Sequence, residues 1–94
     1  MTALQTIQEY AGLNRVPLSI EPLNRFECYF LNTAAQAADL VKRVGAHNLG
    51  YLYDTFHFNI EEDSITDVIP ATIGQINHVH ISENNRGVPG AGHI

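Results

Sequence analysis

Hydrophobic positions along the chain alternate between helical spacing and the two-residue spacing of strands. Residues 2–12 have apolar side chains at helical intervals and begin at Thr2, with Gln5 three residues later as in a capping box. Gly12 suits the end of this helix. Residues 16–21, 49–54 and 76–81 are short runs with strand character. The pattern predicts a helix followed by a strand, repeated three times.

The second helix has the strongest signals. Thr33 and Gln36 have capping-box spacing, and Gly45 suits the helix end. The third helix is weaker because Pro70 lies inside it, so we expect a kink or a short helix there. Ser64 with Asp67 is the candidate cap of this helix. Its expected buried stripe consists of Ile65, Val68, Ile69 and Ile73. Residues 22–32 are expected to form a long loop, as is everything after Ser82.

Each predicted strand places polar and apolar side chains on opposite faces. One face carries Glu21, Asp54 and His80, each at or near the end of its strand. The apolar or aromatic positions of opposite parity should face the helices; these are Ile20, Tyr53, Val79 and Ile81. The three polar side chains should therefore look into a shared interior at one level.

Strands that alternate with helices of this length indicate an α/β fold with parallel strands and right-handed crossovers. An eight-unit barrel of ~250 residues needs about 31 residues per unit. The 94 residues of this chain then correspond to about three units. We expect residues 1–94 to form a single domain that is part of a TIM barrel.

Composition narrows the function. Five Lys and Arg against ten Asp and Glu give a net charge of −5, which argues against a nucleic-acid or anionic-membrane partner. The single cysteine, Cys28, rules out an internal disulfide and fits a reducing compartment. No apolar run approaches the ~18 residues of a membrane helix, and the first ten residues do not resemble a signal peptide. We therefore expect a cytoplasmic protein without a membrane partner.

Sites in parallel α/β folds gather at the carboxyl ends of the strands. Two carboxylates and an imidazole converging there, from Glu21, Asp54 and His80, suit a divalent cation such as Mn²⁺, Mg²⁺ or Co²⁺. The alternative is that each is an ordinary helix cap, a solvated group or a hydrogen-bonded core histidine. Glu27, His57 and Arg86 follow these strand ends on expected loops and could hydrogen-bond a polyhydroxylated substrate, or could simply be exposed.

Three long segments resemble the D-tagatose/D-psicose 3-epimerase family of xylose isomerase-like TIM barrels. They are Glu21-Pro22-Leu23-Asn24-Arg25-Phe26-Glu27, Asp54-Thr55-Phe56-His57-Phe58-Asn59-Ile60-Glu61-Glu62 and His78-Val79-His80-Ile81-Ser82-Glu83-Asn84-Asn85-Arg86. The resemblance covers essentially the whole chain. It implies that the expected strands are the fifth to seventh of the parent barrel.

The resemblance also implies roles for individual residues. Glu21, Asp54 and His80 match three of four ligands of Mn²⁺ or a related ion. Glu21 also matches one of two acid–base groups, which remove and return a proton at C3 of a ketose through an enediolate. The matches to substrate-binding positions near the O1/O2 end of the sugar are Glu27, His57 and Arg86.

The second acid–base Glu of the family lies on the eighth strand, beyond Ile94, so we expect the isolated chain to bind metal weakly and not to epimerise a ketose. Two open sheet edges predict a homo-oligomer. The alternatives are a catalytically inactive oligomeric relict or binding domain, and a hydroxypyruvate isomerase-like or inosose dehydratase-like enzyme. The segment Asn24-Arg25-Phe26-Glu27 favours the epimerase branch.

Overall fold

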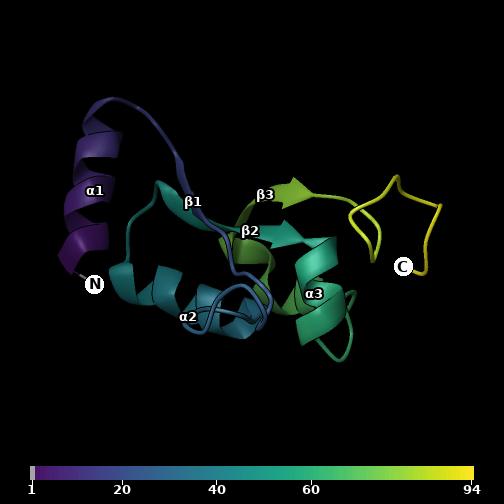
Figure 1. The fold of residues 1–94 in the computed structure, drawn as a ribbon. Helices are drawn as coiled ribbons and strands as arrows, with labels where there is room; N and C mark the ends of the chain where they lie inside the picture. Colours follow the sequence, from purple (N-terminus) through teal and green to yellow (C-terminus); the bar gives the residue numbers. More distant parts are fainter. Residues whose placement is uncertain (1) are drawn as a thin grey trace.

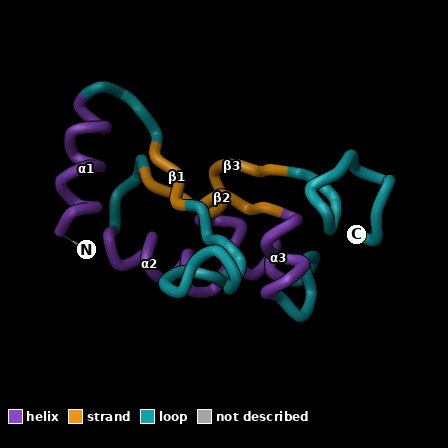
Figure 2. The backbone as a smooth tube through the Cα atoms, in the orientation of Figure 1, coloured by secondary structure: helices purple, strands orange, loops and turns teal. Residues whose placement is uncertain are grey.

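Three parallel strands form the centre of the molecule, in the order β1 (Leu18–Ile20), β2 (Leu49–Asp54), β3 (Ile76–His80). The computed structural model describes residues 2–94. Figure 1 shows helices packed below the sheet, helix α1 (Thr2–Leu13) set apart near the N-terminus, and a long loop leading to the C-terminus. Figure 2 marks this last segment and the connection from β1 to helix α2 (Ala34–Val44) as loop. The α/β class, the parallel strands and the loop after Ser82 are confirmed.

The first predicted helix is α1, Thr2–Leu13. It contributes one buried side chain, Ala11, and is tied to the rest of the molecule where Asn48 Nδ2 donates to the Gln8 carbonyl at 2.9 Å. Strand β1, Leu18–Ile20, is shorter than the predicted 16–21. Glu21 therefore lies just after the strand instead of within it.

The second helix forms as its sequence signals predict. Helix α2, Ala34–Val44, begins with a complete capping box between Thr33 and Gln36. Gly45 ends it in the left-handed region at φ 73°. Its buried residues are Ala34, Ala37, Ala38 and Val41. These small side chains let the helix lie close against β2, Leu49–Asp54, whose six residues are all buried.

A helix that the hydrophobic pattern did not predict follows β2 without a loop. Helix α3, Thr55–Glu61, begins at Asp54, whose Oδ1 accepts from the backbone N–H groups of Phe56 and His57 at 2.8 and 3.3 Å. The expectation that His57 lies on a loop is wrong, because this cap starts the helix at once. Phe58 of α3 is fully buried and packs edge-on to Tyr53, so α3 belongs to the core.

The third predicted helix is short, as expected from Pro70. Helix α4 spans Val68–Thr72 and continues into the 3-10 helix η1, Ile73–Gln75. Pro70 occupies the third position of α4, where a backbone N–H has no partner within the helix. The predicted Ser64 cap is wrong: Asp67 is the N-cap of α4 and makes no side-chain capping hydrogen bond, although Ser64 Oγ accepts from the Asp67 N–H at 3.1 Å.

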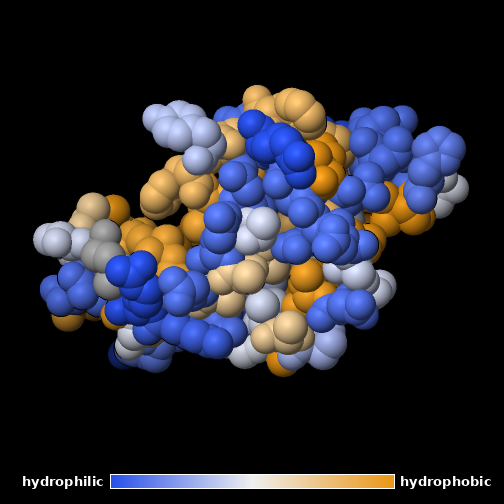
Figure 3. Space-filling model, turned by 90° about the horizontal axis from the view of Figure 1, so that it is seen from below, coloured by the Kyte–Doolittle hydropathy of each residue, from blue (hydrophilic) through white to orange (hydrophobic). Residues whose placement is uncertain are grey.

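The predicted burial of the third helical stripe and of the last strand is partly wrong. Ile65 and Val68 pack against the core, whereas Ile69 and Ile73 are exposed. In and after β3, Ile76–His80, the side chains of Val79 and Ile81 are also exposed instead of covered by helices. Viewed from the side that α2 occupies, the surface is mainly hydrophilic, with separate hydrophobic patches (Figure 3).

A β-bulge sets the register of the last two strands. Tyr51 pairs with Ile76 but Leu52 pairs with His78, so Asn77 is an extra residue in β3. Its side chain crosses the sheet, accepting from Ser19 Oγ at 2.6 Å and donating to the Leu18 carbonyl at 2.8 Å.

The bulge depends on the residue opposite it. A Cβ at Gly50 would lie 2.5 Å from Asn77 Cγ, so the glycine makes room for the bulge. The extra residue brings His80 opposite Asp54, on the same face of the sheet.

Within residues 2–94, no helix has the length and apolar character needed to cross a membrane.

Candidate functional site

The carboxyl ends of the strands bring Glu21, Asp54 and His80 together. Nδ1 of His80 lies 3.5 Å from Asp54 Oδ2 and 3.9 Å from Glu21 Oε2. Asp54 is buried, while Glu21 and His80 are partly open to solvent. The predicted convergence of these three side chains is therefore present in the structure.

Asp54 divides its two oxygens between the fold and the site. Oδ1 caps α3, and Oδ2 faces His80. Because the cap uses a single oxygen, the other is left to accept a proton donor or to ligate a cation. A residue required for starting a helix thus also contributes a carboxylate to the site.

His57 lies beside the carboxylates of Glu21 and Asp54, and not on a loop as expected. It is 3% exposed and sits in the first turn of α3, with Nε2 3.8 Å from Glu21 Oε2. Among residues 2–94, Glu21, Asp54 and His57 form a group whose possible ligand atoms lie within 4.8 Å of one another. His80 borders the same two carboxylates, so the site contains two imidazoles where the sequence pointed to one metal-ligating histidine.

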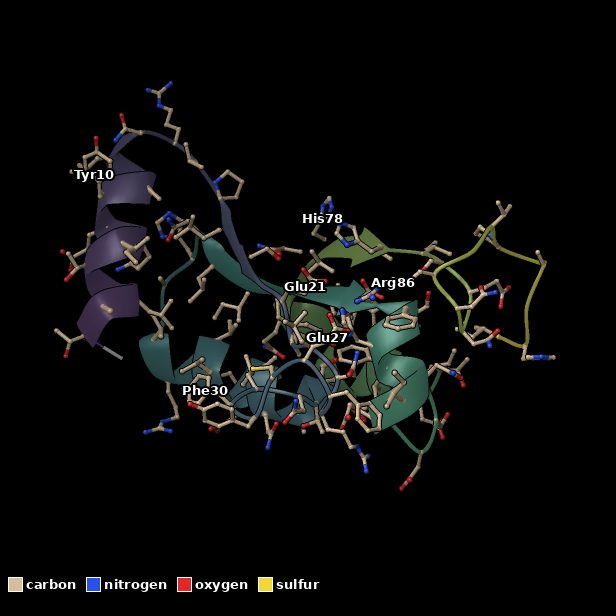
Figure 4. All side chains as sticks on the ribbon, in the orientation of Figure 1. Tyr10, Glu21, Glu27, Phe30, His78 and Arg86 are labelled. Atoms are coloured by element: carbon tan, nitrogen blue, oxygen red, sulfur yellow. The ribbon has the colours of Figure 1, made fainter. Side chains whose placement is uncertain are left out.

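Glu27 and Arg86 form an ion pair at the edge of this group. Arg86 Nη2 donates to Glu27 Oε1 and Oε2 at 2.9 and 2.7 Å. The guanidinium also lies 4.2 Å above the centre of the Phe56 ring, in cation–π contact. The hydrogen bond from Arg86, followed by one from Asn24, holds the pKa of the Glu27 carboxyl below its usual value. Figure 4 shows Glu21, Glu27 and Arg86 in one region, away from Tyr10 and Phe30.

The loop that carries Glu27 is fastened to α3. Glu61 Oε2 accepts from the backbone N–H and from Nε of Arg25, at 2.7 and 2.9 Å. Glu62 accepts from the Ala34 N–H at 2.8 Å, at the start of α2. Both glutamates therefore join the end of α3 to the segment that runs from β1 to the start of α2.

Glu83 has a structural role in the C-terminal loop. Its side chain is buried, and its carboxylate accepts from the backbone N–H groups of Gly90 and Ile94 at 2.7 and 2.9 Å. These bonds hold the pKa of the Glu83 carboxyl below its usual value.

Asn24 is the site residue that sequence reasoning missed. An asparagine in a polar segment is typical of a turn, yet Asn24 is 2% exposed and contacts both Glu27 and His57. Buried asparagines are uncommon, but burial at this position could not be read from the polar segment around it. No hydrophobic periodicity marks the site, so the signal appears only in the folded chain.

Comparison with known proteins places this geometry in a family. The family model described as xylose isomerase-like TIM barrel matches residues 1–94. A D-psicose 3-epimerase from Agrobacterium fabrum is 47% identical over 88 residues, which cover 94% of this chain and 30% of the relative. The chain thus spans about a third of the length of the curated relatives it matches.

Solved structures agree with the sequence comparison. D-Psicose 3-epimerase from Clostridium cellulolyticum H10, solved with D-tagatose, matches with a TM-score of 0.95 and 42% identity over 99% of this chain and 32% of that one. The apo form of 3-keto-D-glucoside 4-epimerase from E. coli matches with a TM-score of 0.93 and 29% identity over 99% and 35%. With three parallel strands covering about a third of these barrels, the chain is a partial TIM barrel that belongs to the xylose isomerase-like TIM barrel family.

Proposed function

We propose that this chain supplies part of the active site of a metal-dependent ketose 3-epimerase. The observation that carries the proposal is the convergence of Glu21, Asp54 and His80 at the strand ends, 3.5 to 3.9 Å apart where His80 meets each carboxylate. The Glu27–Arg86 pair beside them offers charged and hydrogen-bonding groups to a polyhydroxylated ligand. Similarity to D-psicose 3-epimerases supports a ketose as the substrate.

The donor set fits a divalent cation of the Mn²⁺ type, with Mg²⁺ and Co²⁺ as alternatives. Carboxylate and imidazole donors without thiolate suit these ions. Glu21, Asp54 Oδ2 and His80 are the proposed ligands, and a cation bound there would supply a Lewis acid for the oxygens of a ketose. Oδ2 of Asp54 remains available for this because Oδ1 caps α3.

Glu21 has a second proposed role besides metal binding, and the three neighbouring polar residues have a role in substrate binding. Glu21 removes or returns the proton at C3, and its 34% side-chain exposure leaves it accessible to a ligand. Glu27, His57 and Arg86 bind the O1/O2 end of the sugar. Epimerisation also needs a group that delivers a proton to the opposite face of C3, and we propose that this group comes from outside residues 1–94. The chain alone should then bind a cation and a ketose without epimerising the sugar.

Two experiments test the proposal. In the first, the ¹⁵N-labelled chain is titrated with D-fructose in the presence of Mg²⁺. We expect shifts at Glu27, His57 and Arg86 that the matched polyol, sorbitol, does not cause. Equal responses to D-fructose and sorbitol would contradict ketose recognition.

In the second experiment, this chain replaces the aligned segment of the Agrobacterium D-psicose 3-epimerase. We expect the chimera to epimerise a ketohexose at C3, and Glu21→Gln in the chimera to abolish turnover. A folded, metal-loaded chimera without activity would contradict the proposal.

A second candidate is epimerisation at another carbon. The similarity to a 3-keto-D-glucoside 4-epimerase favours it, because the same strand-end residues would then serve proton transfer at C4. Assaying the chimera with a 3-keto-glucoside as well as with a ketohexose separates the two. If neither sugar reacts and Mn²⁺ does not stabilise the chain, the inactive binding domain is the better explanation.

We further propose that residues 1–94 behave as one partial domain, that copies of the chain associate, and that the protein acts in the cytoplasm.

We also propose that the ligand is a small sugar and not a nucleic acid. The similarity to ketose epimerases and the net charge of −5 support this choice.

A further inference from the structure

Asn24 contacts two of the proposed substrate-binding residues at once. Its backbone N–H donates to Nδ1 of His57 at 3.0 Å, and its side-chain Nδ2 donates to Glu27 Oε2 at 2.5 Å. Nδ2 also lies 3.0 Å from Nδ1 of His57. The amide orientation is fixed because Oδ1 accepts from the Phe26 N–H at 2.9 Å. A buried side chain with every polar group engaged has little freedom to rearrange.

These contacts determine which imidazole nitrogen carries the proton. A backbone N–H and an amide NH₂ can only donate, so Nδ1 of His57 must accept. In a neutral imidazole with Nδ1 as acceptor, the proton is on Nε2. Nε2 is the nitrogen that faces Glu21, 3.8 Å from its Oε2. The site therefore receives an N–H donor from His57 and not a lone pair.

We propose that Asn24 is a positioning residue that holds His57 as an Nε2–H donor toward the sugar and fixes Glu27 beside it. The assignment rests on the proposed epimerase function. It separates the two imidazoles: His57 serves as a hydrogen-bond donor to a substrate oxygen, and His80 is the imidazole available to a cation. Although possible ligand atoms of Glu21, Asp54 and His57 lie within 4.8 Å of one another, His57 is then not a metal ligand. A protonated Nε2 has no lone pair to donate to a cation.

The first test is the ¹⁵N NMR signature of the imidazoles in the full 94-residue chain, without metal, at about pH 8 where imidazole is ordinarily neutral. We expect His57 to show a pyrrole-type Nε2 and a pyridine-type Nδ1. A proton on Nδ1 in the wild-type chain would overturn the assignment, whatever the variants do.

Asn24→Asp tests the role of the side chain. It keeps the acceptor for the Phe26 N–H but places a carboxylate oxygen where Nδ2 donated. The Asn24 backbone N–H still donates to Nδ1 in this variant, so we expect a mixture of the two His57 tautomers in place of the Nε2–H form alone. We also expect Glu27 to lose its Asn24 partner. Asn14→Asp adds the same charge on an exposed residue and should leave the His57 signals unchanged. Identical His57 signatures in wild type and Asn24→Asp would show that the side chain has no positioning role.

Mn²⁺ affinity provides an independent measurement. By calorimetry, we expect His80→Gln to weaken Mn²⁺ binding at least tenfold more than His57→Gln, with circular dichroism checking that both variants are folded. The reverse order would overturn the separation of the two imidazoles. Because the NMR signature needs neither metal nor sugar, it can hold when ketose binding fails, so failure of the proposed function remains distinguishable from failure of this inference.

Discussion

Asp54 stands directly opposite His80 in the register of β2 and β3, with Asp54 Oδ2 and His80 Nδ1 3.5 Å apart. This pairing depends on the Asn77 bulge. Continuing the Tyr51–Ile76 register without an extra residue would place Val79 beside Asp54 and turn both His78 and His80 to the other face. The site geometry is therefore fixed partly by a residue that takes no part in the site.

The bulge makes Gly50 sensitive to substitution. Gly50→Ala should destabilise the chain by about 1–3 kcal/mol, because the added Cβ overlaps the Asn77 side chain. Asn77→Gly removes the overlapping atoms, so the double variant should be more stable than the sum of the single effects predicts. Urea unfolding of the four proteins measures this coupling, and strictly additive effects would contradict the steric account.

Cation binding should stabilise the folded chain. At Mn²⁺ concentrations about 100-fold above Kd, the free energy of unfolding should rise by about 2.7 kcal/mol. Asp54→Asn is a sharp control because asparagine still caps α3 but lacks the charge. Its stability without metal should be near that of wild type, and its response to Mn²⁺ should be largely lost. An undiminished response in thermal melts would exclude Asp54 as a ligand.

Phe58 anchors α3, and hence His57, to the core. It is fully buried, with its ring 5.2 Å from that of Tyr53 and 6.1 Å from that of Tyr51, centre to centre. Phe58→Ala should cost about 3–5 kcal/mol. Tyr29→Ala removes an aromatic side chain that is 99% exposed and should change stability by less than about 0.5 kcal/mol. Similar effects of both substitutions on urea unfolding would contradict the burial pattern.

Glu83 should make stability depend on acid pH. Hydrogen bonds from the Ile94 and Gly90 N–H groups lower its folded pKa below the ordinary 4.5. A lowered carboxyl pKa contributes stability above the ordinary value, and that contribution is lost as the pH falls through the lowered pKa. The thermal midpoint should therefore decrease below about pH 4.5, less steeply in Glu83→Gln than in wild type. Parallel acid profiles for the two proteins would show that Glu83 does not contribute.

Exposed aromatic side chains on the β1–α2 loop favour self-association. Phe26, Tyr29 and Phe30 are between 74% and 99% exposed, and β1 and β3 each have one unpaired edge within the described residues. We expect dimers or larger species in sedimentation at micromolar concentration. Tyr29→Ser with Phe30→Ser should shift the distribution toward monomer. A monodisperse wild-type monomer would contradict this expectation.

Helix α2 and strand β2 could be predicted because local sequence determines them. The Thr33–Gln36 capping box and the left-handed Gly45 are local signals, and β2 is a continuous run with clear ends. The alternation of residues along each strand also predicted that Glu21, Asp54 and His80 share a face, and this alternation is a property of neighbouring residues that the sequence displays directly. The register that sets His80 opposite Asp54 comes instead from the bulge.

The remaining features depend on contacts between distant residues. Helix α3 escaped prediction because its cap, Asp54, is also the last residue of a strand, with no loop residues to mark the change. The bulge requires Gly50 and Asn77 together, and Asn24 gains its role from His57, 33 positions away. Periodicity cannot reveal such pairs, since each member alone has an ordinary local environment.

Asp54 caps α3 with one oxygen and faces His80 with the other, so the stability of the first turn of α3 depends on whether the site is occupied. If the first turn of α3 opens, the Phe56 and His57 amides lose their acceptor and His57 leaves the carboxylates in the same event. Amide hydrogen exchange at those two positions should then slow whenever a ligand holds Asp54 in place. Two backbone protons would thus report whether the site is filled, without any need for turnover.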